Sequence, residues 1–183
     1  QSLTVVPKQL IRDQAMTTVA DALRYVPGVS MHQGEGNRDQ VVLRGNSSSA
    51  DFFLDGVRDD VQYFRDLYNL ERVEALRGPN AMIFGRGGGG GVINRVTKTA
   101  GFTSFREVDV QAGSFGDLRA SADVNQQLSR SFALRLNGVA EDSGSFRDHV
   151  DLKRWGVAPS LAFLAGDATT VTLSYERFHD GRT

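Results

Sequence analysis

Five consecutive glycines at residues 87–91 constrain the fold of this chain more than any other feature. They follow the segment Leu76-Arg77-Gly78-Pro79-Asn80-Ala81-Met82-Ile83-Phe84-Gly85-Arg86 and lead into Val92-Ile93-Asn94-Arg95-Val96-Thr97. Glycine tolerates tight turns and lets one stretch of backbone approach another closely. A tract of this density predicts a compact, irregular region followed by a strand, rather than an ordinary helix-and-strand module.

The composition excludes several classes of protein. A chain of 183 residues with 40% hydrophobic residues can form one or two domains with a modest core. Its 21 basic and 22 acidic residues nearly cancel, which argues against nucleic acid as a partner because phosphate binding needs a cationic excess. The chain has no cysteine, and this excludes disulfides, cysteine metal sites and thiolate nucleophiles.

The sequence offers no apolar run of about 18 residues for a transmembrane helix. Residence in a membrane would therefore require β-strands. The opening residues Gln1-Ser2-Leu3-Thr4 contain no charged leader followed by an apolar core, so any signal peptide is expected upstream of them.

The first hundred residues mix one helix, short strands and long polar loops. Thr17 and Thr18 offer a helix N-cap, apolar residues follow at helical spacing, and Pro27-Gly28 ends the helix. An Asp-Gly turn signal stands at Asp55-Gly56. The expected strands of this half are residues 3–6, 41–45, 52–57, 70–76 and 92–97.

After Gly101 the pattern changes to alternation of apolar and polar residues. Tight turns at 127–131 and 165–169 and a longer charged loop at 142–153 separate the alternating segments. Short turns on one side and longer loops on the other are typical of an outer-membrane barrel, although a soluble sandwich also has one apolar and one polar face. The expected strands are residues 107–112, 118–125, 132–138, 155–163 and 171–175.

Short motifs follow one another along the chain in a set order. They are Gln1-Ser2-Leu3-Thr4-Val5-Val6, Asp21-Ala22-Leu23-Arg24-Tyr25-Val26-Pro27-Gly28-Val29, Leu43-Arg44-Gly45, Asp55-Gly56-Val57, Leu70-Glu71-Arg72-Val73-Glu74, Arg77-Gly78-Pro79 and Phe84-Gly85. In this order the chain resembles the TonB-dependent outer-membrane siderophore receptors. The resemblance implies an α+β plug domain over residues 1–99, followed by antiparallel transmembrane β-barrel strands over residues 100–183, a partial barrel of about five strands.

Complete transporters of this kind close 22 strands around a plugged lumen. Five strands cannot close, and bare strand edges are not tolerated in lipid. We therefore expect the chain to be a fragment, with the TonB-contacting segment upstream of it and the remaining barrel strands downstream.

Three polar loops, residues 32–40, 46–51 and 59–69, are expected to face the ligand if the family layout holds. The resemblance places an aromatic pair at the siderophore, and arginines would balance an anionic ferric chelate. The alternative is that the aromatic pair packs under its own loop and the arginines are solvated. The predicted ligand-binding residues are Arg38, Ser48, Gln62, Tyr63, Phe64 and Arg65.

Arg44 and Arg77 resemble the paired plug arginines of the family, which meet two barrel glutamates and hold the plug in place. The partner glutamates would stand on later strands. Breaking such a shielded cluster leaves charge unpaired, which suits a two-state latch. The alternative is that both arginines make ordinary surface contacts.

Other chemistry finds little support in the sequence. The spacing of Gly85, Gly87 and Gly90 formally matches a dinucleotide motif, but a β-branched strand follows instead of a phosphate-binding helix. The three histidines are far apart and lack metal-ligand spacing. The serines at 47–49 lack the Gly-x-Ser-x-Gly surroundings of a nucleophilic serine. We therefore expect no enzyme activity, no protein metal site and no cofactor, with iron arriving already chelated.

The resemblance implies a TonB-dependent receptor that imports a ferric siderophore, and residues 62–66 favour the catecholate type. It implies three partners: the ferric siderophore, TonB with its inner-membrane energising complex, and the lipid of the Gram-negative outer membrane. Two alternatives remain open. One is the same receptor class with cobalamin or an oligosaccharide as cargo, and the other is a soluble β-rich interaction module.

Overall fold

The computed structural model describes residues 2–32, 38–48, 51–78, 81, 84, 90–166 and 168–182. The chain divides into two compact units, Gln1–Thr97 and Lys98–Thr183. Among the described residues, no helix is both long and apolar enough to cross a bilayer.

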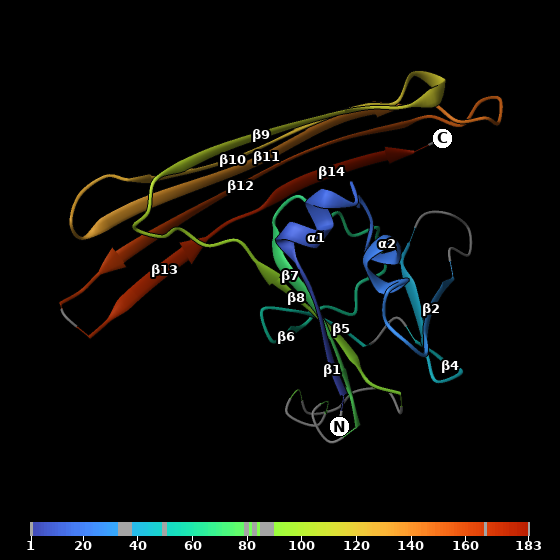
Figure 1. Cartoon of the computed structure of the whole chain (residues 1–183), viewed down its shortest axis with the longest axis horizontal. Helices are drawn as coiled ribbons and strands as arrows, with labels where there is room; N and C mark the ends of the chain where they lie inside the picture. Colours follow the sequence, from blue (N-terminus) through green and yellow to red (C-terminus); the bar gives the residue numbers. More distant parts are fainter. Residues whose placement is uncertain are drawn as a thin grey trace. The chain divides into compact units, whose positions relative to one another are not determined.

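A mixed sheet of five strands organises the first unit (Figure 1). Its spatial order is β1-β7-β8-β5-β6, and only the pairing of β5 with β8 is parallel. The Asp-Gly turn signal is confirmed, because Asp55 and Gly56 both have positive φ angles and join β5 to β6 as a tight hairpin. The strands are β1 (Ser2–Pro7), β5 (Phe52–Leu54), β6 (Val57–Arg58), β7 (Leu70–Arg77) and β8 (Val92–Thr97).

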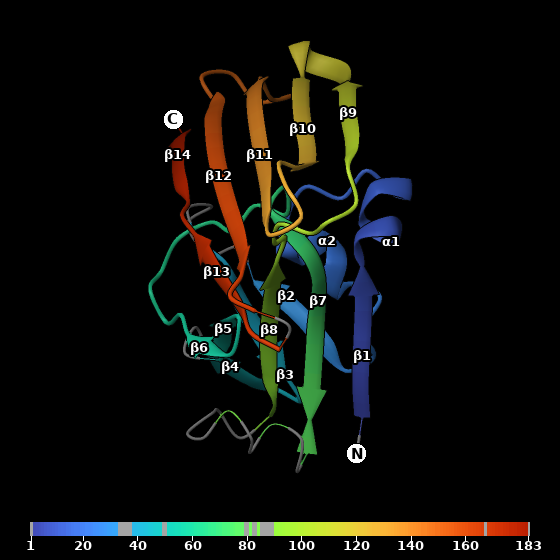
Figure 2. The same ribbon diagram turned by 90° about the vertical axis from the view of Figure 1, so that its left-hand side faces the viewer.

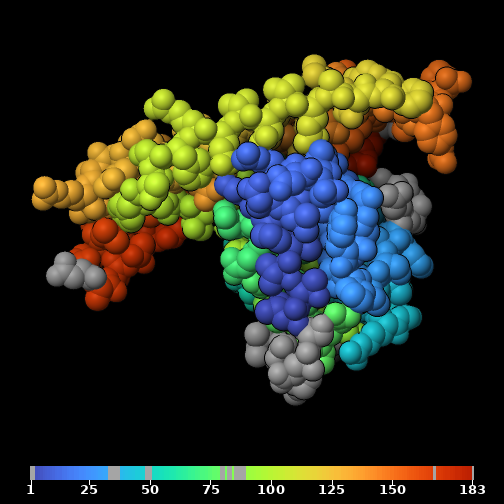
Figure 3. Space-filling model, in the orientation of Figure 1, coloured from blue at the N-terminus to red at the C-terminus, as the bar shows by residue number. Residues whose placement is uncertain are grey.

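Two short helices follow β1. Helix α2 (Val19–Leu23) is the expected one, and Thr18 caps it by accepting a hydrogen bond from the Asp21 N–H while Asp21 reaches back to the Thr18 N–H. Helix α1 (Lys8–Asp13) was not predicted, because no side-chain cap precedes it. In Figure 3 the blue residues of β1 and the helices form a continuous part of the surface of this unit.

A second, three-stranded sheet completes the first unit. Strands β2 (Val29–His32), β3 (Gln40–Leu43) and β4 (Asn46–Ser48) pair antiparallel in chain order. The turn between β3 and β4 consists of Arg44 and Gly45, both with positive φ angles. Only β3 was expected from the sequence, because β2 and β4 are only four and three residues long and neither contains two adjacent apolar residues.

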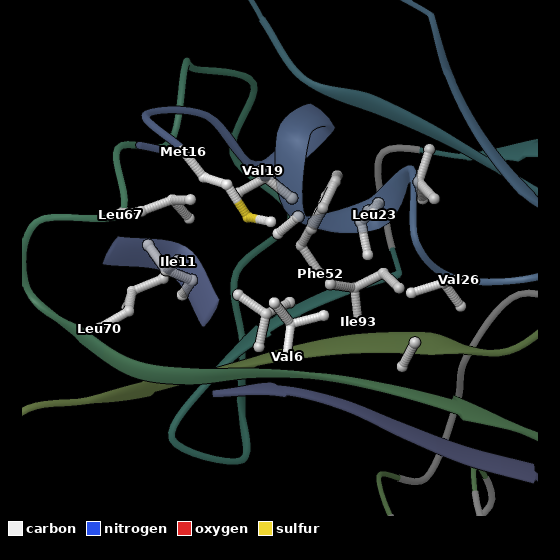
Figure 4. Packing of buried hydrophobic residues seen from close by; sticks show 14 of the residues in the cluster. Val6, Ile11, Met16, Val19, Leu23, Val26, Phe52, Leu67, Leu70 and Ile93 are labelled. Atoms are coloured by element: carbon white, nitrogen blue, oxygen red, sulfur yellow. The ribbon is translucent and has the colours of Figure 1, made fainter. Parts of the chain in front are cut away.

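The core of the first unit lies between the helices and the large sheet (Figure 4). Side chains from both helices meet side chains from the central strands, as with Val19 and Leu23 of α2 against Phe52 and Ile93. Burying a side chain of this size contributes about 1.5–3 kcal/mol. The core therefore fixes the central strands β5 and β8, from which the candidate site is built.

The second unit is an antiparallel sheet of long strands (Figure 2). Strands β9 to β12 form a meander, and both β13 and β14 pair with β12, β13 along its end and β14 along its start. The five expected strands are present, and β14 is an addition. The strands are β9 (Phe105–Ala112), β10 (Leu118–Gln127), β11 (Phe132–Ser143), β12 (Leu152–Leu164), β13 (Thr170–Ser174) and β14 (Arg177–Arg182).

The two faces of this sheet differ in polarity, as the alternation predicted. Val108, Val110, Leu134 and Leu136 share an exposed apolar face. The opposite face carries ion pairs between neighbouring strands, including Arg119 and Arg154 with Glu141, and Arg135 with Asp123. A long-stranded sheet with one apolar face and one polar, ion-paired face is typical of a wall segment of a membrane barrel.

Candidate functional site

The three loops expected to face a ligand are joined by three consecutive residues, Arg38, Asp39 and Gln40. The Arg38 guanidinium donates a hydrogen bond to the Gln62 side-chain oxygen. The Gln40 amide donates to the Ser47 hydroxyl at 2.8 Å. The described parts of the loops at 32–40, 46–51 and 59–69 therefore meet, although they are distant in sequence.

Asp39 makes the deepest of these connections. Its backbone N–H donates to the Tyr63 carbonyl at 3.2 Å, and its buried carboxylate accepts the Arg65 backbone N–H at 2.8 Å. These two bonds run side by side between segments more than twenty residues apart. They fix the main chain of residues 63–65 against the segment that carries Arg38.

Arg65 organises the loop of residues 57–65 from inside. Its side chain is fully buried, and its guanidinium donates to the carbonyls of Tyr63, Asp59 and Val61 at 3.1, 3.0 and 2.7 Å. The guanidinium carbon lies 4.1 Å from the Phe52 ring centroid and 4.3 Å from that of Tyr63. Arginine suits this position because its planar fork of five donors can serve several acceptors at once.

The carboxylate of Asp59 binds three side chains. It accepts the Tyr63 hydroxyl at 2.7 Å and the Arg65 Nε at 3.3 Å, and it also accepts a hydrogen bond from Arg95. Arg95 donates to the Tyr63 hydroxyl as well, at 3.0 Å. Loop residues and the β8 residue Arg95 thus belong to one buried polar network.

Burial and neighbouring charge shift the proton equilibria in this network. Burial, followed by the positive charge of Arg95, lowers the pKa of Arg65 from its ordinary value. Burial raises the pKa of Tyr63, and the bond to Asp59 acts in the same direction while Arg95 opposes both. The Tyr63 hydroxyl therefore keeps its proton at neutral pH and remains a donor to Asp59.

The hairpin turn that precedes this loop is also attached to β8. The Asp55 N–H donates to the Arg95 carbonyl at 2.8 Å, and the Gly56 N–H donates to the Asn94 side chain at 3.0 Å. The Asp55 carboxylate accepts the backbone N–H and the hydroxyl of Thr97 at 2.8 and 2.6 Å. Asp55 and Gly56 are therefore held at three residues of β8, Asn94, Arg95 and Thr97.

Two of the predicted ligand-binding residues are near the surface, where they contact each other. Gln62 is exposed and Arg38 half-buried. The other three predicted residues of the central stretch lie deeper. Arg65 is only 1% exposed and Phe64 is buried, while the half-buried Tyr63 directs its hydroxyl to Asp59. The aromatic pair thus packs against its own loop, and Arg65 is buried rather than solvated. The ligand-binding role of the pair stays a prediction.

Parts of the predicted loops lie outside the described residues. These are positions 33–37 and 49–50, together with the side chain of Ser48, whose backbone belongs to β4. The first three residues of the glycine run, 87–89, are also outside.

The two predicted latch arginines lie at the same turn. The Arg44 backbone N–H donates to the Gly28 carbonyl at 3.2 Å, and its side chain is exposed. The Arg77 guanidinium donates to the Pro27 carbonyl and reaches the Thr4 hydroxyl at 3.5 Å. The turn at Pro27-Gly28 thus brings both residues together, and the latch role stays a prediction.

Sequence reasoning missed Arg95, and it placed Asp39 and Asp59 in polar loops without giving either a role. The sequence does contain a signal for Arg95, because Asn94 and Arg95 interrupt an otherwise apolar and β-branched strand. In the structure both residues are buried. No local pattern distinguishes Asp39 or Asp59 from surface loop aspartates. Their role depends on partners that are distant in sequence.

The arrangement is suited to non-covalent recognition. Its surface presents the Arg38 guanidinium and the Gln62 amide, both hydrogen-bond donors, on two segments that a polar network joins from beneath. In the described ranges, no group of three or more histidine or acidic side chains is placed to hold a metal ion.

Fold and site together define a class of protein: a small α+β plug domain followed by the strands of an antiparallel membrane barrel. The family described as TonB-dependent Receptor Plug Domain matches residues 1–92, half of the chain. The chain belongs to this family.

Individual relatives agree. The chain is 39% identical over its whole length to the probable TonB-dependent receptor BfrD of Bordetella pertussis, and 38% identical over 96% of its length to the catecholate siderophore receptor Fiu of Escherichia coli K12. The closed-form crystal structure of Fiu superimposes with a TM-score of 0.91 at 34% identity, covering 100% of this chain and 27% of Fiu. The siderophore receptor PiuA of Acinetobacter baumannii gives 0.90 at 34% identity, covering 98% and 26%.

The chain spans about a quarter of the length of its curated relatives, 25% of BfrD and 24% of Fiu. The matched part holds the plug and the first strands of the barrel. The expected family and fold class are therefore confirmed.

Proposed function

We propose that this chain is the plug and the opening barrel segment of a TonB-dependent outer-membrane receptor that binds and imports a ferric siderophore of the catecholate type. The observation that carries the proposal is the meeting of three plug loops at Arg38–Asp39–Gln40, which builds one surface around Arg38 and Gln62. Relatives named as catecholate or siderophore receptors support the cargo class.

The chemistry proposed for this surface is recognition without bond making. The Arg38 guanidinium offers charge-assisted hydrogen bonds to an anionic ferric chelate, and the Gln62 amide adds a neutral donor. A ligand shifts the plug between states only by its difference in affinity for those states. Contacts to the loop surface therefore have to change on release.

The proposed partners follow from the same assignment. TonB and its inner-membrane complex would supply the energy for release, and the apolar face of the second unit would lie against outer-membrane lipid. Arg44 and Arg77 would form the plug side of a latch with glutamates of the barrel. Both arginines are anchored at the Pro27-Gly28 turn, so a change at this turn would move them together.

The test is uptake of radioactive iron by iron-starved cells with and without the full-length gene. Ferric catecholate, ferric hydroxamate and ferric citrate are offered separately, each with and without a protonophore. We expect gene-dependent uptake from the ferric catecholate that stops when the proton gradient is removed. Gene-dependent uptake from another chelate alone would overturn the catecholate class. No gene-dependent uptake from any chelate would overturn the siderophore assignment and direct the search to cobalamin and glycans.

A further inference from the structure

We infer that Arg65 is a positioning residue for ligand recognition: with Asp59 and Arg95 it holds the loop of residues 57–65 in the conformation that presents Gln62 and Arg38, and it does not contact the ligand itself. The inference rests on the proposed function for the identity of the ligand. The structural part stands on contacts within the first unit alone.

The first argument is the choice of acceptors. Arg65 donates to three backbone carbonyls, those of Asp59, Val61 and Tyr63, all within residues 59–65, the part of the loop that follows β6. Buried carbonyls need donors, and a loop has no strand partner to supply them. The guanidinium takes the place of a strand partner here, so residues 59–65 have a defined shape without regular secondary structure.

The second argument is the anchoring of this loop at both sides. Asp59 connects the Arg65 guanidinium to Arg95 on β8. Asp39 receives the Arg65 backbone N–H and donates its own N–H to Tyr63. One side of the loop is thus fixed to the central sheet and the other to the segment that carries Arg38.

The third argument is the contrast between the base of the loop and its tip. Arg65 is 1% exposed, whereas Val61 is 64% exposed and Gln62 is exposed as well. A ligand that approaches from solvent meets the tip and not the guanidinium. Pre-ordering the tip reduces the conformational entropy that binding has to remove.

Substitution by lysine distinguishes an arginine that positions a loop from an arginine that contacts the ligand through its charge. Lysine keeps the positive charge but cannot reproduce a planar fork with several fixed donors. A residue that contacts an anionic ligand through charge tolerates lysine, whereas a residue that shapes a loop through three carbonyls does not. Arg38, half-buried and beside Gln62, is the matched position where lysine should be tolerated.

The test uses the full-length receptor in detergent with the iron(III) tris-catecholate of 2,3-dihydroxybenzoate as probe. We expect Arg65→Lys and Arg65→Gln to weaken binding alike, by about tenfold, because both lose the ordering of the loop. Arg38→Lys should stay within about twofold of the wild type while Arg38→Gln weakens binding. Arg58→Gln, in the same loop with an exposed ion pair to Asp60, is the control without effect.

Hydrogen exchange gives a readout that does not depend on ligand identity. In Arg65→Lys the amides of Asp39 and Arg65 should lose protection, while those of Asp55 and Gly56, held by β8, keep it. If Arg65→Lys does not fold, Asp59→Asn should release the same two amides. Wild-type binding by Arg65→Lys with loss only in Arg65→Gln would overturn the inference, as would unchanged exchange at Asp39 and Arg65. Failure of the wild type to bind the probe counts against the proposed catecholate cargo, and the exchange result decides the inference separately.

Discussion

Gly90, near the end of the glycine run, occupies its position because of a close contact rather than a special backbone angle. A Cβ atom at Gly90 would lie 2.4 Å from the Leu43 carbonyl oxygen and 2.6 Å from the Leu43 Cβ. The backbone there packs directly on β3. This is the close backbone approach that the density of glycines predicted.

Gly90→Ala should therefore force β3 away from the chain beside it. We expect the local stability of β3 to fall by about 1–3 kcal/mol, the usual cost of overpacking. Hydrogen exchange of the β3 amides in the full-length receptor measures this. Gly101→Ala is the control, because a Cβ atom there meets nothing within 4 Å, and its effect should stay within about 0.5 kcal/mol. Equal protection in both variants would contradict the packing argument.

The roles of single charged residues were the hardest to predict. The stretch at 62–66 was correctly placed in a loop, but Arg65 lies beneath that loop rather than at its surface. The direction of a side chain in an irregular loop depends on which acceptors the fold brings near, and Asp39 and the β8 residue Arg95 are distant in sequence. Turn residues were easier to predict, because aspartate and glycine adopt positive φ angles more readily than most residues. Asp55 and Gly56 both do so here.

At the scale of elements, α2 shows how a local signal fixes a boundary. Burial by itself would raise the pKa of Asp21. Hydrogen bonds to its carboxylate outweigh burial and lower the pKa below the ordinary 3.8. The donors are the Thr18 side chain, the backbone N–H groups of Thr17 and Thr18, and the Arg24 side chain. A carboxylate with a lowered pKa stabilises the folded state above its unfolded pKa, and this contribution is lost as the pH falls through the folded pKa.

Protection of the α2 amides of Ala22 and Leu23 should thus be constant above about pH 4 and decline below it. Asp21→Asn should flatten this dependence. Thr18→Ala should cost about 1 kcal/mol at neutral pH through loss of the cap. Hydrogen exchange between pH 3 and 7, corrected for intrinsic rates, measures both effects. A decline that persists in Asp21→Asn would assign the pH dependence to another group.

Elements with a strong local pattern were predicted, and those without one were missed. The long alternating strands of the second unit and the capped helix α2 carry their own signals. Helix α1 has no cap, and β4 is polar. Strand β14 (Arg177–Arg182) consists mostly of charged and polar residues. It forms through its pairing with β12 and not through an apolar face, so the sequence pattern did not predict it.

For the whole molecule, the difference in polarity between the two faces of the second unit predicts which substitutions impair assembly in a membrane. Leu136 lies on the apolar face opposite Pro159 and Val124. Leu136→Arg should cost about 2–4 kcal/mol if that face meets the bilayer centre. Heat-modifiable mobility of the full-length receptor from outer membranes should show less assembled protein.

Ser121→Arg provides the matched control. Ser121 lies on the polar face directly opposite Asp109, so an arginine there gains an opposite charge across the strands. Assembly should stay near the wild-type level. Equal loss in both variants would indicate a general intolerance of the sheet to arginine and would argue against lipid at the apolar face.

The way in which Arg65 holds its loop has a consequence for how such receptors diversify. Its three loop carbonyls belong to the main chain, so the support of the loop does not depend on which side chains stand at positions 60, 61 and 62. Recognition and support are thus encoded by different residues. A lineage, or a library randomised at these three positions with Arg65 and Asp59 kept, can explore new cargo while the scaffold beneath stays constant.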